Sequence, residues 1–250
     1  MLFLLSPAKT FSNDLRNPLK RVTQPLFTSE SQKLINELRP QSVGDIQKLM
    51  KLSENLACLN VGRYRAWEKN HSEKNSQPAI FRFYGDVYKG LQAEAFAAED
   101  VEYAQDHVGV LSGLYGFLRP LDLMKDYRLE MGTKLHNAKG KDLYAFWSGA
   151  VTDYLNNQKE GVIVNLASKE YSSVIDSKSL NKTMIEIVFK EKKGDAYKIV
   201  AIYAKKARGV FARWALTNQV EKLEDLKNFN EEGYRYESSL STDTSLTFVR

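Results

Sequence analysis

The chain opens with an unbroken apolar run, Leu2–Leu5, that stops at Ser6 and Pro7. Consecutive apolar residues bounded by a turn signal are typical of a strand that is buried on both faces. Runs rich in Val, Ile, Phe and Tyr predict further strands at 162–167, 183–189, 197–204 and 245–250. The polar segment Glu191–Asp195, which contains a glycine, predicts a hairpin turn between two of these strands.

Helical signals come between the first strand and the later ones. Ser29 is placed to cap a helix over 29–38, which stops before Pro40. Ser42, followed three residues later by Asp45, predicts the start of a second helix. Leucines continue at helical spacing beyond it and predict a stripe buried in a helical lobe, at positions 49, 52, 56 and 59.

The remaining segments set the architecture. Residues 13–25 are polar and interrupted by proline, which predicts a loop, whereas 142–156 and 210–219 carry helical patterns. The polar stretch 71–78 is short enough to be a loop between elements and not a domain boundary. We therefore expect a mixed α/β (α+β) fold in which residues 1–250 form a single compact domain, with helices flanking a mixed sheet.

Charge and composition narrow the functional classes only slightly. The formal net charge of +5 makes a polyanionic partner such as nucleic acid plausible, but 31 acidic residues are interspersed, so the basic residues must be clustered to matter. A mildly basic protein with no polyanionic ligand explains the charge equally well. The N-terminal run has no basic leader and is too short to cross a membrane, which favours a cytoplasmic protein without a membrane partner.

Cysteine and histidine usage argues against a metal centre. A single cysteine, Cys58, excludes an internal disulfide and a cysteine-based metal cluster, and its apolar neighbours predict a core thiol. The three histidines, His71, His107 and His136, do not lie at metal-ligand spacings. We expect no stable metal site and no cofactor.

The segment 110–133 concentrates apolar residues, glycines and arginines. Ser112, Gly113 and Gly116 offer backbone that a ligand can approach closely, while Arg119 and Arg128 carry the planar donor fork that suits phosphate or carboxylate. An anion is therefore the expected ligand. The stretch LSGLYG at 111–116 also has glycines that bound a hairpin, as in the helix-hairpin-helix of DNA-repair proteins, although glycines that only supply positive φ angles would look the same.

Two segments near predicted strand ends also carry polar groups. Ser6–Thr10, SPAKT, places Lys9 and two hydroxyls after the first strand, where open sheets often bind phosphates or nucleotides. It lacks the glycines of a Walker loop, so a loop closed by a capping hydroxyl is an equal alternative. The segment 165–171, NLASKEY, supplies Asn165 and Glu170 after another predicted strand.

Two further segments carry basic residues, and in one of them they alternate with aromatic residues. In 81–91, Tyr84 and Tyr88 surround Gly85 and Asp86; their rings could stack on bases, or simply fill the core, and Asp86 would need a partner if buried. The segment 205–209, KKARG, follows a predicted strand and could neutralise phosphates or merely form a solvated edge.

Five of these segments occur in the same order in the YaaA family of bacterial peroxide-stress proteins, which the chain resembles over essentially its whole length: SPAKT, YGDVYKGL, LSGLYGFLRPLDLMKDYRLEMGT, NLASKEY and KKARG. The resemblance implies a cytosolic protein that aids survival of hydrogen peroxide by limiting iron damage. It also implies an unusual α/β fold with a basic cleft that binds DNA and includes a helix-hairpin-helix element. Mapped onto this chain, the implied DNA contacts are Lys9, Ser112, Gly113, Gly116, Arg119, Lys125, Arg128, Lys205, Lys206 and Arg208.

Three hypotheses follow. The leading one is a DNA-binding protein of the peroxide response that contacts backbone phosphate in duplex or branched DNA with little sequence preference. The rival is an enzyme acting on a nucleotide or nucleobase derivative in a charged pocket formed with Lys9 and Arg128 by Ser6, Asp86, Glu130, Asn165 and Glu170. The third is an interaction protein whose basic cleft binds an acidic partner. The sequence leaves the oligomeric state open.

Overall fold

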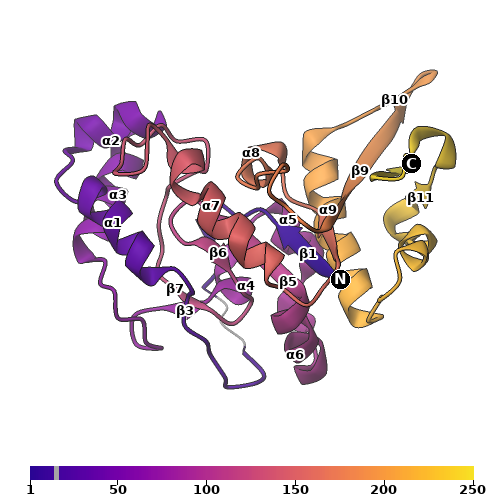
Figure 1. The fold of residues 1–250 in the computed structure, drawn as a ribbon, viewed down its shortest axis with the longest axis horizontal. Coiled ribbons are helices and arrows are strands. Elements are labelled where there is room, and N and C mark those ends of the chain that lie inside the picture. The colour runs from indigo at the N-terminus through magenta and orange to yellow at the C-terminus, as the bar shows by residue number, and fades with distance from the viewer. Residues whose placement is uncertain (14–16) are drawn as a thin grey trace.

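A mostly parallel sheet forms the centre of the molecule in the computed structural model, which describes residues 1–13 and 17–250 (Figure 1). Within these residues its eight strands run in the order β11-β12-β9-β8-β1-β5-β6, with β10 paired to β9. The parallel strands are β1 (Leu2–Leu5), β5 (Val108–Ser112), β8 (Val162–Asn165), β9 (Thr183–Lys193) and β12 (Ser245–Val249). The antiparallel strands are β6 (Gly116–Leu118), β10 (Ala196–Lys198) and β11 (Arg235–Tyr236).

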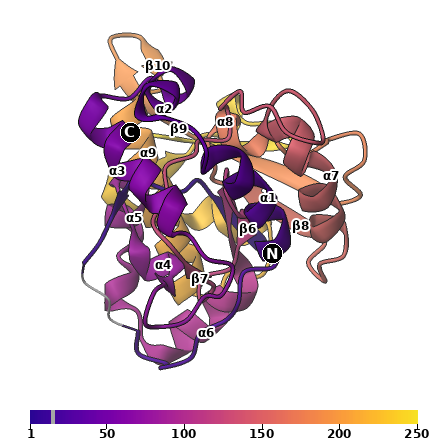
Figure 2. The same cartoon turned by 90° about the vertical axis from the view of Figure 1, so that its left-hand side faces the viewer.

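Helices cover both faces of this sheet, as Figure 2 shows. On one face lies α7 (Leu143–Asn156), and on the other lie α5 (Asp86–Leu91), α6 (Ala98–His107) and α9 (Ala201–Thr217). A helical lobe at the opposite end of the molecule from β9 contains α1 (Thr28–Leu38), α2 (Val43–Met50) and α3 (Glu54–Ala66). The prediction of a mixed α/β fold with a helix-flanked sheet is confirmed.

Short elements connect the lobe to the sheet. Two small antiparallel pairs join β2 (Thr10–Phe11) to β4 (Phe83–Tyr84), and β3 (Gln77–Pro78) to β7 (Leu123–Met124). The remaining short helices are α4 (Ala79–Arg82), α8 (Lys169–Ser172) and 3-10 turns at Ala93–Ala95, Glu224–Asn228, Glu231–Gly233 and Ser238–Leu240. Residues 14–16 of the predicted loop 13–25 lie outside the described residues.

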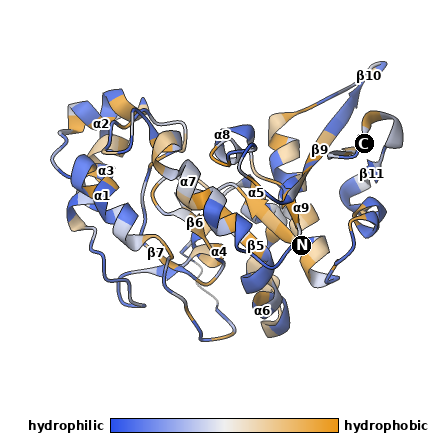
Figure 3. Cartoon of the chain, in the orientation of Figure 1, coloured by the Kyte–Doolittle hydropathy of each residue, from blue (hydrophilic) through white to orange (hydrophobic). Residues whose placement is uncertain are grey.

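Apolar runs explain the central strands, and side-chain caps explain the starts of α2 and α7. All of Leu2–Leu5 is buried, because a central parallel strand has helices on both faces. Figure 3 colours the central strands as hydrophobic and the outer helices as mixed. At the start of α2, Ser42 and Asp45 form the predicted capping box, and Asp142 caps α7 by accepting a hydrogen bond from the Ala145 N–H at 2.9 Å. The helix expected from Ser29 instead begins at Thr28, so Ser29 lies inside it.

The strand predicted at 197–204 is wrong beyond Lys198, because α9 begins at Ala201. Ala204, Ala207 and Phe211 are buried at helical spacing, whereas Ile202 is 60% exposed. The β-branched residues gave a strand signal, but packing of the helical stripe against the sheet decided the conformation. The predicted turn at Glu191–Asp195 is confirmed, since β9 and β10 pair around it.

The leucine stripe predicted across 49–59 is also wrong in part. Leu56 and Leu59 are 42% and 49% exposed, and Cys58 is exposed and not a core thiol. The helix is interrupted at Lys51, whose φ is +53°, so the helical phase restarts in α3 and buries a different face. No helix in the described part of the chain has the length and apolar character needed to cross a membrane.

Candidate nucleic-acid interface

The LSGLYG segment forms a buried β-hairpin between β5 and β6, so the helix-hairpin-helix predicted there is wrong. The Ser112 hydroxyl closes the turn by accepting a hydrogen bond from the Tyr115 N–H at 2.9 Å. A Cβ atom at Gly113 would overlap the carbonyl oxygen of Leu129. One at Gly116, where φ is +69°, would press on the Trp147 ring. Ser112, Gly113 and Gly116 are buried and serve turn geometry and core packing.

Arg119 does not join the other cations of its segment. Its Nη2 binds the buried Asp122 Oδ1 at 2.8 Å, and it lines a surface hollow together with Leu2 and Val108, at the amino ends of β1 and β5. Burial raises the pKa of Asp122, although the hydrogen bonds and charge of Arg119 oppose that effect. Lys9 follows the carboxyl end of β1, so the two cations lie toward opposite ends of the sheet.

Lys9, Arg128 and Glu130 do converge. The Glu130 Oε1 accepts a hydrogen bond from Arg128 Nε at 3.0 Å and forms ion pairs with Lys9 Nζ and Arg128 Nη2, each at 2.9 Å. The Tyr64 hydroxyl of α3 donates to the Arg128 carbonyl and fixes this backbone against the helical lobe. Two segments far apart in the sequence thus form one ion cluster with a net positive charge.

A second ion cluster joins α3, α4 and the segment after β7. Asp126 accepts two hydrogen bonds from Arg82, at 2.7 and 2.8 Å, and its Oδ2 lies 3.4 Å from Arg63 Nη2. Both guanidinium groups lie over the Phe11 ring, at 5.3 and 5.5 Å from its centroid. Burial, together with the charges of Arg82 and Arg128, lowers the pKa of Arg63, and Asp126 opposes the shift. Sequence reasoning missed Arg63 and Asp126, because no local motif marks either residue.

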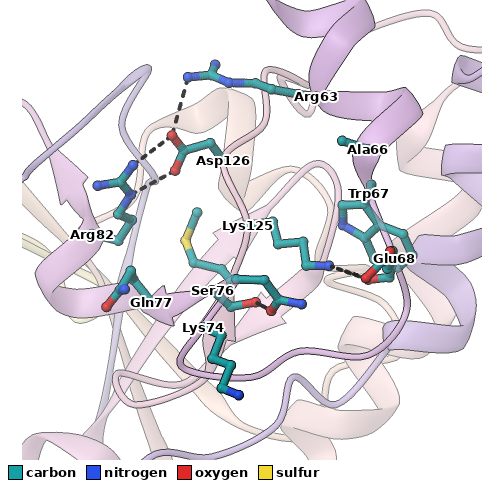
Figure 4. Close-up of a pocket in the computed structure, with 12 residues that line it drawn as sticks. Arg63, Ala66, Trp67, Glu68, Lys74, Ser76, Gln77, Arg82, Lys125 and Asp126 are labelled. Atoms are coloured by element: carbon teal, nitrogen blue, oxygen red, sulfur yellow. Dashed lines mark hydrogen bonds and ion pairs between the residues drawn. The ribbon is translucent and has the colours of Figure 1, made fainter.

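These side chains border an open hollow of about 610 Å³ (Figure 4). Its described lining includes four basic residues, Arg63, Lys74, Arg82 and Lys125, and two acids, Glu68 and Asp126. Its other lining residues are Ala66, Trp67, Asn75, Ser76, Gln77 and Met124. Among the described residues Lys74 makes no ion pair, and in Figure 4 it lies at the edge of the hollow. The hollow therefore has a net positive lining.

Lys125 is the one predicted DNA contact that lines this hollow. Its Nζ donates to the Glu68 carbonyl at 3.0 Å and lies 5.9 Å from the centroid of the Trp67 ring. Burial lowers the pKa of Lys125, and the charge of Glu68 opposes that shift. A desolvated ammonium held in this way gains from an anion placed nearby.

The cations of the 205–209 segment lie on α9 and point in different directions. Lys205 is exposed, and Lys206 Nζ binds Glu232 Oε1 at 2.6 Å. Arg208 is half-buried, and its Nε has no hydrogen-bond partner within the part of the chain that the structure describes. Burial lowers the pKa of Arg208, and Glu186 opposes the shift. This segment does not contribute a cluster of cations.

Most of the predicted pocket residues are linked by contacts near the carboxyl ends of β1 and β8. Ser6 Oγ accepts a hydrogen bond from the Ser168 N–H at 2.8 Å, and Asn165 donates to Glu186 at 2.8 Å. Glu170 accepts a hydrogen bond from the N–H of Gly132 at 3.1 Å, and Gly132 lies two residues after Glu130 in the chain. Glu130 and Glu170 both lie near Tyr171, whose pKa is raised chiefly by burial and further by these two carboxylates. Asp86, at the start of α5, makes no hydrogen bond or ion pair with the described residues.

A helical hairpin does occur elsewhere, in α2 and α3. The two helices are consecutive, and only Lys51–Ser53 joins them. Lys48 and Lys51 are exposed beside this turn, and Ser53 makes no side-chain hydrogen bond at the start of α3. The opposite end of α3 carries Arg63 into the hollow. The sequence predicted both helices.

Groups of three or more His, Cys, Asp or Glu side chains arranged to hold a metal ion are absent from the described residues. The expectations that the protein has no metal and no cofactor stay predictions.

Comparison with known proteins gives a consistent result. Residues 1–240 match the family described as peroxide stress protein YaaA. A UPF0246 protein of Bordetella pertussis is 48% identical, with 100% of this chain and 99% of that protein covered. A UPF0246 protein of Polynucleobacter asymbioticus is 51% identical, with 94% and 93% covered, and one of Albidiferax ferrireducens is 48% identical, with 100% and 98% covered. The chain therefore belongs to the peroxide stress protein YaaA family, which supports a role in the response to peroxide.

Proposed function

We propose that this protein binds DNA in the peroxide response and that the basic hollow beside α3 is the main contact surface. One observation carries the proposal: Arg63, Lys74, Arg82 and Lys125 border a single open hollow of about 610 Å³. Guanidinium groups bind phosphate through two parallel donors, and lysines add point charges. The neighbouring Lys9 and Arg128 extend the positive charge beyond the rim.

In this proposal the acidic residues of the surface position the neighbouring basic side chains and do not cancel their charge. Asp126 holds the Arg82 fork through two hydrogen bonds, which fixes the direction of the guanidinium before any ligand arrives. Contacts with phosphate oxygens carry no direct base information, so we expect duplex or branched DNA to bind with little sequence preference.

The hairpin of α2 and α3 supplies a second contact in this proposal. Lys48 and Lys51 flank the turn, and the first N–H groups of α3 carry the positive end of the helix dipole toward it. At about 1.5 Å per residue, α3 separates this turn from Arg63 by no more than roughly 20 Å. A DNA segment lying along α3 would therefore contact both the hairpin and the hollow.

Protection from iron follows from the same chemistry. Cations condense on DNA phosphates, and a protein that neutralises those phosphates releases them. Bound iron cations would be displaced in this way from the strand that peroxide would otherwise damage. We expect the wild-type protein to lower strand cleavage by iron and peroxide in vitro and the Arg63→Ala variant to lower it less.

The direct test is a fluorescence-anisotropy titration of a labelled duplex at several salt concentrations. Arg63→Ala and Lys74→Ala should each weaken binding and lower the slope of log affinity against log salt by about one unit. Arg235→Ala is the matched control, because Arg235 is an exposed arginine on β11 at the far end of the sheet. Binding that does not depend on salt, or an equal loss in the control, would refute the proposal.

The enzyme hypothesis keeps one supporting observation. Glu130 is held by Lys9 and Arg128 in one cluster, which orients a carboxylate as a small-molecule site requires. Glu130→Gln and Asp86→Asn should then abolish thermal stabilisation by compounds of a nucleotide and nucleobase panel. If no compound stabilises the wild type and both variants lose DNA binding while remaining well folded, the enzyme hypothesis fails, and both acids instead position the cations of the basic surface.

A further inference from the structure

A second hollow, of about 330 Å³, lies beside the Arg82 cluster. Phe81 and Phe83 line it on either side of Arg82 in the sequence, and Arg82 Nη1 donates to the carbonyl of Ser12, another lining residue. Among the described residues, the lining consists of Ser12, Ile80, Phe81, Phe83, Tyr84, Tyr88, Lys89, Gln92, Ala93 and Glu94. A hollow lined by aromatic and polar side chains is thus joined through Arg82 to the basic hollow.

Tyr84 differs from the other aromatic residues of this segment. Phe81, Phe83 and Tyr88 are buried and form the floor of the hollow, as a core role requires, whereas Tyr84 is 47% exposed. It follows Phe83 in β4, and the side chains of a strand alternate between faces, so its ring points away from the core. Lys89 Nζ lies 5.0 Å from the centroid of the Tyr84 ring. Tyr84 therefore presents an aromatic ring at the surface of the hollow.

We propose that this hollow accepts one unpaired nucleobase of a DNA strand, stacked on Tyr84, while Arg82 and Lys89 hold the adjoining phosphates. The inference rests on the proposed DNA binding and adds to it a preference for DNA with an extruded or unpaired base. Every base has a flat π-face, so stacking on an exposed tyrosine does not depend on sequence. The volume lies near the lower limit of small-ligand sites.

The polar lining fits a base better than a purely apolar ligand. Glu94 supplies an acceptor for the exocyclic amino groups of bases, and Lys89 supplies a donor. A paired base has these edges occupied by its partner and its faces covered by its neighbours in the stack. An unpaired base can enter the hollow without the cost of breaking a pair.

The test compares two DNA probes that share the same flanking sequence. One is a fully paired duplex, and the other carries a single-base bulge with the fluorescent adenine analogue 2-aminopurine. The wild-type protein should bind the bulged probe about tenfold more tightly than the paired probe, with a change in 2-aminopurine fluorescence on binding. Tyr84→Ala should remove both effects and leave affinity for the paired duplex unchanged, whereas Tyr84→Phe should keep them.

Tyr203→Ala is the matched control, because Tyr203 is 48% exposed and also lies under a cation, with Arg250 at 5.1 Å from its ring centroid. It should behave as the wild type does. If Tyr84→Ala, with an unchanged melting profile, keeps the bulge preference, the inference is wrong. If the wild type binds both probes equally and with normal salt dependence, the inference is wrong but the proposed DNA binding stands. Failure to bind either probe refutes the proposed function itself.

Discussion

Two basic segments of this chain, 125–128 and 205–208, have similar composition but different surroundings. Lys125 and Arg128 lie in an irregular segment and join cations that come from α3, α4 and the loop after β1. The cations of 205–208 lie on α9, where one is exposed, one pairs with Glu232 and one is half-buried. Only the first segment contributes to a cluster.

The difference comes from backbone geometry. On an α-helix successive residues are rotated by about 100°, so adjacent cations of α9 point to different sides. The segment around 125–128 has no helix of its own, and its side chains are directed by hydrogen bonds to other parts of the chain. A run of basic residues therefore identifies a binding surface only when its backbone conformation is known.

The largest expected effect tests whether packing against α5 determines the helical conformation of α9. Gly209 lies at the crossing of α9 with α5, where an added Cβ would overlap the Val87 carbonyl oxygen. Gly209→Ala should lower the free energy of unfolding by about 3 kcal/mol or more, because two backbones must separate. The melting temperature should fall by roughly 6–12 °C, as measured by calorimetry.

Gly62→Ala is the control, since no atom lies within 4 Å of an added Cβ in the middle of α3. Alanine is the better helix former, so this variant should melt at or above the wild-type temperature. A Gly209→Ala protein that melts as the wild type does would show that helix packing does not fix the segment.

The next effect compares the two segments directly by removing two cations from each. Lys125→Ala with Arg128→Ala should reduce the salt slope of DNA binding by about two units, because both side chains belong to the proposed surface. Lys205→Ala with Lys206→Ala should leave that slope nearly unchanged. Equal losses in the two double variants, measured in folded proteins, would mean that α9 also contacts DNA and that the contrast is wrong.

The smallest expected effect concerns the protonation of His71, a buried residue close to Lys125 of the first segment. His71 is buried and contacts the Tyr115 hydroxyl at 3.0 Å and the Lys69 carbonyl at 2.9 Å. Burial lowers the pKa of His71 below its ordinary value of 6.5, and the charge of Lys125 adds to this shift. The unfolded chain then binds the proton more readily, so the stability from His71 is complete above about pH 6.5 and is lost as the pH falls below it.

Calorimetry between about pH 7.5 and 5.5 should show this loss in the wild type and a smaller one in His71→Gln. The exposed His136 provides the control, and His136→Gln should keep the wild-type pH dependence. If stability falls with pH equally in the wild type and in His71→Gln, His71 is not the source of the pH dependence.

The candidate site was only partly predictable. Lys9, Lys125 and Arg128 were identified from their segments, but Arg63, Arg82 and Asp126 were not identified as one cluster. These three residues are far apart in the sequence and meet because β2 pairs with β4 and β3 pairs with β7. Each of these strands has only two residues, too few for a periodic pattern.

The sequence by itself determined the elements whose signals are local. Three of them occur as expected: the buried strand Leu2–Leu5, the capping box at Ser42 and the glycine-containing turn before β10. In each case residues within the element fix its backbone conformation. Tertiary structure decided the rest. It made a β-hairpin of LSGLYG, extended α9 over a predicted strand, and gathered one set of cations while dispersing the other. Those outcomes depend on which distant surfaces pack together, and a local pattern does not carry that information.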